Sequence, residues 1–137
     1  AMEGLYHGLP AIAVSEAPNS ENTTITAKFT ADLVDRYRRL GAPSGTMISI
    51  NVPAGELKGV AVRPMGDSYL STARYNPTVR DSMTTDYESV RMIVDSEDPA
   101  TDTYAYQQGY ISVTPLKFDW TDFEMLDEIE SWNLQID

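Results

Sequence analysis

The feature that most constrains the fold of this chain is the segment 109–116, which reads G-Y-I-S-V-T-P-L. Tyr110, Ile111 and Val113 favour extended structure, and they lie between Gly109 and Pro115, which we expect to begin and end the strand. A second segment, L-P-A-I-A-V-S at 9–15, is an almost unbroken apolar run. Such a run is typical of a strand covered on both faces in a parallel sheet. Together the two strands predict an α/β fold.

The segments between and after these strands predict helices and one more strand. Apolar residues recur at helical spacing over 24–40, which indicates an amphipathic helix packed on the sheet. The segment 47–52 alternates apolar and polar residues, as a strand with one buried face does. A short helix is predicted from 101 or 102 to 108, ended by a glycine. A capping-box pattern at 121–124 opens a C-terminal helix.

A long β-hairpin arm is predicted at about 66–95. Two segments rich in Tyr, Thr, Val and Met, 68–75 and 87–94, flank a polar stretch at 76–86 that contains a proline and reads as a loose tip. A two-stranded ribbon is only marginally stable alone, so we expect a neighbouring subunit to cover its apolar side chains. The candidates for this oligomer interface are Tyr69, Tyr75, Tyr87, Val90 and Met92.

Composition narrows the classes of partner. The 137 residues suit a single domain, and the net charge of −11 argues against binding of polymeric nucleic acid, which needs a clustered basic face. The chain has no cysteine, so a disulfide or a thiolate metal site is excluded. No apolar run approaches the length of a membrane span, and the start does not read as a secretory signal. We therefore expect a cytoplasmic protein with no membrane partner.

An acidic loop at 95–102, D-S-E-D-P-A-T-D, has the highest density of carboxylates. An EF-hand calcium loop needs Gly at its sixth position and Glu at its twelfth, where this chain has Ala100 and Tyr106. A solvated acidic loop is therefore favoured over a calcium site. If the chain did hold a metal, the first ligands to test would be Asp95, Glu97, Asp98 and Asp102.

No complete active site is visible in the sequence, so no catalytic residue is assigned. His7 is the only histidine, and it has no second ligand three or four residues away. Ser15 and Ser112 lack the G-x-S-x-G setting of a nucleophile elbow. The basic group Arg36, Arg38 and Arg39 falls in the last turn of the predicted helix, where cations stabilise the helix dipole.

Four blocks of the sequence resemble the second half of the SurE family of "survival protein" 5'/3'-nucleotidases, which are metal-dependent acid phosphatases. They are L-P-A-I-A-V-S at 9–15, M-I-S-I-N-V-P at 47–53, the segment 101–116, and D-W-T at 119–121. The blocks follow the family order and extend over essentially the whole chain. The family's N-terminal half, with a T-N-D-D-G-type motif of paired aspartates, has no counterpart in this sequence.

The resemblance implies a SurE-like, Rossmann-type sheet portion with a long hairpin arm and a C-terminal helix, so that 1–137 is one domain from the C-terminal part of a phosphatase. It also implies that the family's metal ligands, the paired aspartates, a serine and an asparagine, precede residue 1. No metal ligand is therefore assigned here. A divalent metal, Mg or Mn, is expected for the complete enzyme and none on this chain. The family's arm takes part in oligomer contacts, so a homo-oligomer, dimer or tetramer, is expected.

Two functions follow from these expectations. In the first, the chain is part of a metal-dependent phosphatase that hydrolyses nucleoside 5'/3'-monophosphates; it supplies scaffold and oligomer contacts and is inactive alone. In the second, the chain is a short non-catalytic interaction or assembly module derived from the same fold. The coding sequence upstream of residue 1 distinguishes them.

Overall fold

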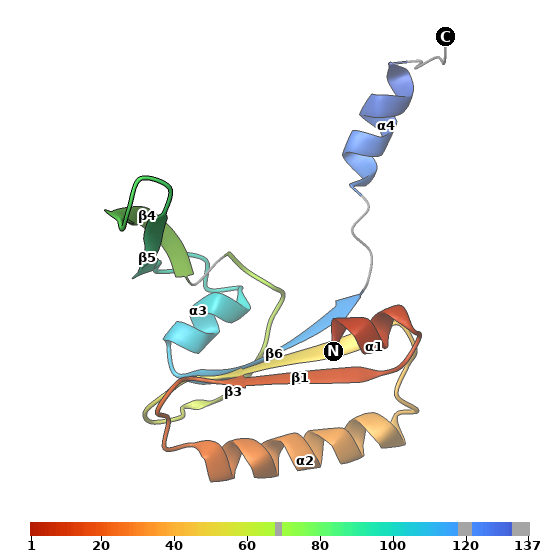
Figure 1. Ribbon diagram of the computed structural model, residues 1–137. Helices are drawn as coiled ribbons and strands as arrows, with labels where there is room; N and C mark the ends of the chain where they lie inside the picture. Colours follow the sequence, from red (N-terminus) through yellow and green to blue (C-terminus); the bar gives the residue numbers. More distant parts are fainter. Residues whose placement is uncertain (68–69, 118–121, 133–137) are drawn as a thin grey trace.

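The computed structural model describes residues 1–67, 70–117 and 122–132 (Figure 1). Its main sheet has four strands, in the order β1-β2-β6-β3. These are β1 (Ala11–Glu16), β2 (Thr46–Val52), β6 (Tyr110–Lys117) and β3 (Gly59–Val62). β1 and β2 are parallel, β6 runs antiparallel to β2, and β3 is parallel to β6. The α/β class is thus confirmed, with a mixed sheet.

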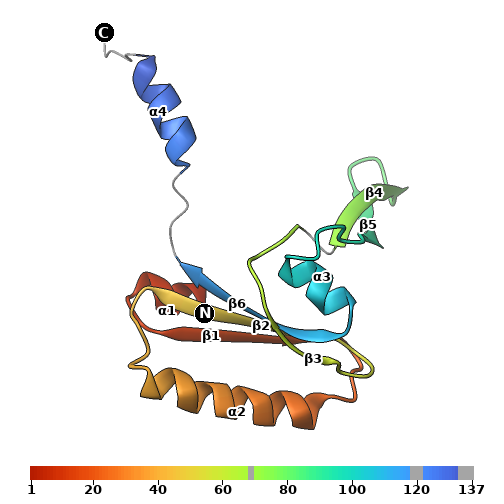
Figure 2. The same cartoon turned by 180° about the vertical axis from the view of Figure 1, so that it is seen from behind.

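Helices cover both faces of this sheet. α2 (Thr23–Arg39) lies along one face, and α1 (Met2–Tyr6) and α3 (Asp102–Gln107) lie on the other, as the views from the front and from behind both show (Figures 1 and 2). The helix expected at 24–40 is therefore confirmed to within one residue at each end.

The core lies between the sheet and α2. Its buried members come from β2 and β6, and Phe29 and Leu33 of α2 pack against them. Burial of each large aliphatic side chain is worth about 1.5–3 kcal/mol, so this layer supplies most of the apolar contribution to stability. The buried residues are Ile50, Val52, Ile111 and Val113.

Strand β1 differs from its expected environment. The apolar run at 9–15 predicted a strand covered on both faces, but β1 is half-buried, and Val14 is 42% exposed. The reason is position: among the described residues β1 pairs with β2 alone, so it forms one edge of the sheet.

The arm is present as a separate two-stranded antiparallel sheet of β4 (Leu70–Val79) and β5 (Thr85–Ile93). The stretch expected as a loose tip, 76–86, is mostly strand, and the turn is confined to 80–84. Pro77 fits within β4 because a two-stranded ribbon has an outer edge on which no N–H is needed. The pairing of β4 with β5 therefore extends further toward the tip of the arm than the polar composition of 76–86 predicted.

Helix α3 holds both legs of the arm. Thr103 Oγ1 donates to the carbonyl of Asp67 at 2.7 Å, just before β4. Gln107 Nε2 donates to the carbonyl of Val94 at 2.6 Å, and its Oε1 accepts from Ser96 N at 2.8 Å, just after β5. Side chains one helical turn apart therefore fix the base of the arm to the sheet layer.

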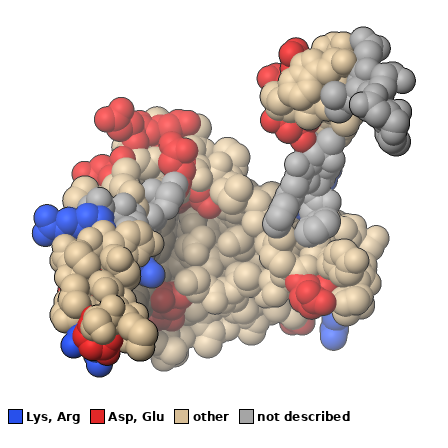
Figure 3. Space-filling model, turned by 45° about the horizontal axis from the view of Figure 1, so that its top comes forward, with Lys and Arg blue, Asp and Glu red and all other residues tan. Residues whose placement is uncertain are grey.

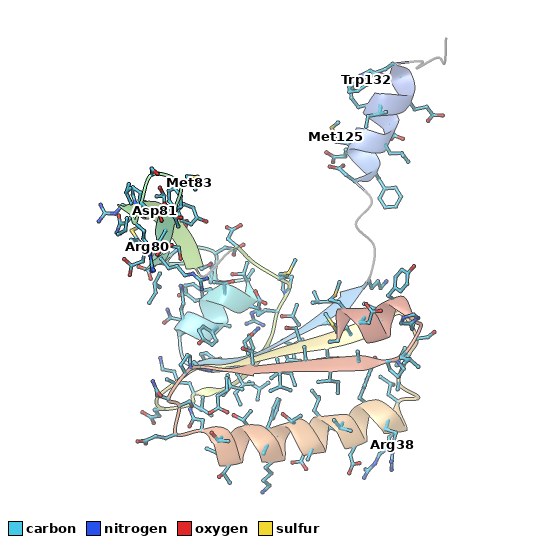
Figure 4. All side chains as sticks on the ribbon, in the orientation of Figure 1. Arg38, Arg80, Asp81, Met83, Met125 and Trp132 are labelled. Carbon is cyan, nitrogen blue, oxygen red and sulfur yellow. The ribbon has the colours of Figure 1, made fainter. Side chains whose placement is uncertain are left out.

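The C-terminal helix is α4 (Phe123–Ser131), which extends away from the sheet (Figures 1 and 2). Its cap is Asp122, whose Oδ1 accepts from Met125 N at 3.0 Å; Thr121, the cap that the capping box predicted, lies outside the described residues. Figure 4 marks two of its exposed apolar side chains, Met125 and Trp132. No described helix is long and apolar enough to cross a membrane.

Candidate functional site

A row of polar side chains crosses three strands of the sheet. Ser15 of β1 is the register partner of Asn51 of β2, which is in turn the partner of Ser112 of β6. Side chains alternate between the faces of a strand, so register partners share a face. All three line one cavity together with residues of α3, so the row lies on the α3 face rather than on the α2 core face.

This cavity has a volume of about 310 Å³. The row forms its floor, and the remaining lining residues come from α3, from the last residue of β1 and from the loop that follows it. It lies where the parallel strands β1 and β2 end, and ligands of open α/β sheets bind outside the carboxyl ends of such strands. The other lining residues are Glu16, Ala17, Pro18, Asp102, Thr103 and Tyr106.

Asp102 is a structural clamp in the wall of this cavity. Its Oδ1 accepts from Gly66 N at 2.8 Å, and its Oδ2 accepts from Thr114 Oγ1 at 3.0 Å. Its own backbone N–H donates to the carbonyl of Pro64 at 3.0 Å. One buried carboxylate thus joins α3, β6 and the segment between β3 and the arm.

Ser112 also lines this cavity, but unlike Asp102 its side chain makes no hydrogen bond among the described residues. It is 1% exposed, yet its Oγ has no hydrogen-bond partner among the described residues. A buried hydroxyl in this state costs about 1–3 kcal/mol, which native structures usually avoid by binding water or a ligand. Thr114, two residues along the same strand, has the partner that Ser112 lacks. The floor of the cavity therefore presents an unused hydroxyl.

Glu16 supplies a negative charge at the cavity's edge. The hydroxyls of Thr26, Ser20 and Thr23 surround its carboxylate and hold its pKa below the ordinary value of 4.5. Thr23 Oγ1 donates to Glu16 Oε1 at 3.1 Å, whereas Thr26 Oγ1 stands outside strict hydrogen-bond geometry. Glu16 is thus ionised at neutral pH and acts as a hydrogen-bond acceptor.

The acidic loop divides into two parts in the structure. Asp95, Glu97 and Asp98 are exposed, while both oxygens of Asp102 are already engaged. Across the residues that the structure describes, no group of three or more His, Cys, Asp or Glu could hold a metal ion. The divalent metal of the SurE family therefore does not fit the described residues.

The remaining sequence candidates lie elsewhere. His7, which follows the last residue of α1, has its Nε2 3.1 Å from Glu3 Oε1 of that helix in an exposed contact. Arg36, Arg38 and Arg39 are in the last turn of α2 as expected, and Figure 4 shows Arg38 on the side of the helix away from the sheet. None of these residues lines the cavity.

The predicted oligomer-interface residues lie on two faces of the arm. Tyr75 and Tyr87 occupy one face of the arm. Tyr87 of β5 is the register partner of Pro77, and Pro77 lies two residues from Tyr75 on β4, so all three side chains point to the same side. Val90, half-buried, and Met92, exposed, occupy the other face. Tyr69 lies outside the described residues.

Comparison with known proteins relates this arrangement to a family. A family model described as "Survival protein SurE" matches residues 1–72, which is more than half of the chain. The chain belongs to the SurE family. The resemblance carried by the four sequence blocks is thereby confirmed.

Relatives of known sequence and structure align over nearly all of the chain. A 5'-nucleotidase SurE from Thermoanaerobacter sp. (strain X514) is 32% identical over 100% of it, and one from Stutzerimonas stutzeri (strain A1501) is 34% identical over 96%. The crystal structure of the SurE protein from Aquifex aeolicus matches 98% of the chain with a TM-score of 0.74 and 28% identity. The chain spans 56% of the Thermoanaerobacter and Aquifex proteins and 55% of the Stutzerimonas protein.

Sequence reasoning examined Ser15 and Ser112 only as nucleophiles and did not recognise the polar row. A signal was available, because two polar residues stand at alternate positions in each of the two central strands: Ser49 and Asn51 in β2, Ser112 and Thr114 in β6. Such a stripe in otherwise apolar strands indicates a face that meets polar partners. Which residues meet still depended on the register.

Proposed function

We propose that this chain forms part of a metal-dependent phosphatase that hydrolyses nucleoside 5'- and 3'-monophosphates. The observation that supports the proposal is the alignment of proteins described as 5'-nucleotidase SurE over 96–100% of this chain, in the two relatives named above. The cavity at the carboxyl ends of β1 and β2 agrees with it, since that edge is where α/β sheets bind nucleotides.

The role proposed for this chain is scaffold and assembly rather than metal binding. A divalent ion supplies an activated water and polarises the phosphoryl group in such enzymes. The described residues offer no group of ligands for that ion, and the family resemblance puts the ligands before residue 1. Mg or Mn therefore belongs to the complete enzyme.

A comparison of two polypeptides tests this proposal. The 137-residue chain is incubated with nucleoside monophosphates and with p-nitrophenyl phosphate, in the presence of magnesium or manganese, and we expect no turnover. A polypeptide extended upstream by a strand and paired aspartates is expected to hydrolyse the same substrates and to lose activity with a chelator. Metal-dependent turnover that copurifies with the short chain would refute the assignment.

We also propose that one face of the arm is the contact surface of a homo-oligomer, a dimer or tetramer. The face defined by Tyr75, Pro77, Val79 and Tyr87 is a continuous apolar surface, because Pro77 is the partner of Tyr87 and the others lie two residues away on the same strand. All four side chains are exposed. Contiguous apolar surface of this kind in a soluble protein marks an interaction site.

The register supplies a matched control for this contact. Tyr87→Lys places a charge on the apolar face, and Thr78→Lys places the same charge on the opposite face of the arm, at an exposed residue that is not an interface candidate. Light scattering at micromolar concentration should show dissociation for Tyr87→Lys and an unchanged mass for Thr78→Lys. A wild-type chain that is monomeric with an ordered arm would contradict the proposed contact.

The alternative function is a non-catalytic assembly module. It is favoured by the same exposed face of the arm together with the lack of metal ligands among the described residues. The upstream extension separates the alternatives, because a module of this kind would assemble without gaining phosphatase activity.

A further inference from the structure

The cavity above the polar row has the dimensions and the chemistry of a ligand site. Its volume of about 310 Å³ lies within the range of small-molecule sites, which begins at about 300 Å³. Its residues come from β1, β2, β6 and α3, elements that hydrogen bonds hold in place. The cavity is therefore part of the folded framework.

The independent observation that points to a ligand is the hydroxyl of Ser112. The residue lines the cavity, is 1% exposed, and its Oγ lacks any hydrogen-bond partner among the described residues. Two other buried hydroxyls make no hydrogen bond among the described residues, that of Thr26, which interacts with the Glu16 carboxylate, and that of Thr30; both lie on α2 and are not among the lining residues. Ser112 is thus the unpartnered group that faces this space.

The charge of the lining excludes an anion. Glu16 and Asp102 are the charged residues that line the cavity, and none of its described lining residues is Lys or Arg. On the face of the molecule drawn in Figure 3, carboxylates cover more of the surface than basic side chains. A phosphate group in this cavity would face carboxylates with no compensating cation.

The donors and acceptors fit a hydroxylated, uncharged group. The Glu16 carboxylate accepts hydrogen bonds, while the Asn51 amide and the Ser112 hydroxyl can both donate and accept. A carboxylate that accepts from a ribose hydroxyl is the usual recognition element for the sugar of nucleotides on α/β sheets. Tyr106 and Pro18 add apolar surface that can cover one side of a sugar ring.

We infer that the cavity is a subsite for the ribose hydroxyls of a nucleoside, with Ser112 and Asn51 on the floor and Glu16 at the rim. The choice of ribose among hydroxylated groups rests on the proposed nucleotidase function. The subsite itself requires neither metal nor phosphate. Ser112, Asn51 and Glu16 are thus binding residues rather than catalytic residues.

Nucleosides without phosphate test the subsite in the 137-residue chain. Adenosine is titrated against the ¹⁵N-labelled chain, and the amide signals of Ser15, Asn51 and Ser112 are followed. We expect saturable shifts of these signals with adenosine, and binding at least about tenfold weaker with 2',3'-dideoxyadenosine, which lacks both ring hydroxyls and so loses more than one hydrogen bond. Equal binding of adenosine, dideoxyadenosine and adenine would overturn the ribose assignment.

Ser112→Ala tests the residue, and Ser49→Ala is its matched control. Ser49 lies two residues before Asn51 on the same face of β2 but does not line the cavity. We expect Ser112→Ala to weaken adenosine binding by about two- to tenfold and Ser49→Ala to leave it unchanged. Unchanged binding in Ser112→Ala would refute the subsite.

A stability measurement distinguishes a ligand-binding role of the Ser112 hydroxyl from a structural role. Because the hydroxyl of Ser112 has no partner, Ser112→Ala should unfold in urea at the same or a higher midpoint than the wild type. A lower midpoint would mean that the hydroxyl is structurally satisfied, which contradicts the inference. Absence of adenosine binding would refute the subsite and leave the phosphatase proposal to its own assay, since no hydrolysis is measured here.

Discussion

The carboxylate of Asp102 holds the site together, and its removal has a calculable effect. Asp102→Ala deletes the acceptor of Gly66 N, at 2.8 Å, and that of Thr114 Oγ1, at 3.0 Å. Each buried donor left without a partner costs about 1–3 kcal/mol. We therefore expect the free energy of unfolding to fall by about 2–5 kcal/mol, at the upper end of what single substitutions cause.

Asp102→Asn separates the charge from the shape. The amide oxygen can still accept from Gly66 N, and the amide nitrogen can donate to Thr114 Oγ1 once that hydroxyl rotates. Only the charge-assisted part of the two bonds is lost, so the expected destabilisation is about 1–2 kcal/mol. The control is Asp95→Asn, an exposed carboxylate in the same acidic loop, expected within about 0.5 kcal/mol of the wild type.

Equilibrium urea unfolding followed by far-ultraviolet circular dichroism measures all three variants. The midpoint should fall in the order Asp95→Asn, Asp102→Asn, Asp102→Ala, at a constant slope with denaturant. If Asp102→Ala loses less than about 1 kcal/mol, the loss would be below the cost of even one orphaned donor, and the clamp would be refuted.

Three further predictions concern the same region. Gly66→Ala should destabilise the chain by about 1–3 kcal/mol in the same urea assay, because a Cβ there would lie 2.5 Å from Thr101 Cβ. Asn22→Ala should cost about 1–3 kcal/mol, because its Nδ2 donates to two carbonyls of the β2–β3 loop at 3.0 and 2.9 Å; an unchanged midpoint would show that water replaces it. The pKa of Glu16 is lowered, chiefly by Thr26, so the ionised carboxylate stabilises the folded chain above pH 4.5. This stabilisation is lost as the pH falls through the folded-state pKa, and the acid unfolding curves of wild type and Glu16→Gln should converge there.

Local signals along the chain were enough to locate most helices and strands. The helical spacing of apolar residues predicted α2, and the residues between Gly109 and Pro115 predicted the first part of β6. The expected end of this strand at Pro115 was wrong, because β6 continues through Pro115 to Lys117 in register with β2. The Thr101 cap predicted α3, and its Oγ1 accepts from Tyr104 N at 3.4 Å. These signals lie within one turn or one strand, so the residues that create them are neighbours in sequence.

Local composition was a poorer guide to how far strands extend and what covers them. The polar stretch 76–79 joined β4 because β5 offers it partners, from Asn76 with Glu88 to Val79 with Thr85. The apolar β1 became half-exposed because its place at the sheet edge is set by its pairing. Composition measures an average preference for strand, whereas pairing and burial are supplied by distant segments.

The candidate site exists only after folding. Ser15, Asn51 and Ser112 come from three strands, and they share a row because the registers of β1 with β2 and of β2 with β6 align them. A slip of one residue in either register would turn one of these side chains to the opposite face of the sheet. Register is set by the pairing of strands that are distant in sequence. No single stretch of sequence could therefore show that the hydroxyl of Ser112 would be buried without a partner among the described residues.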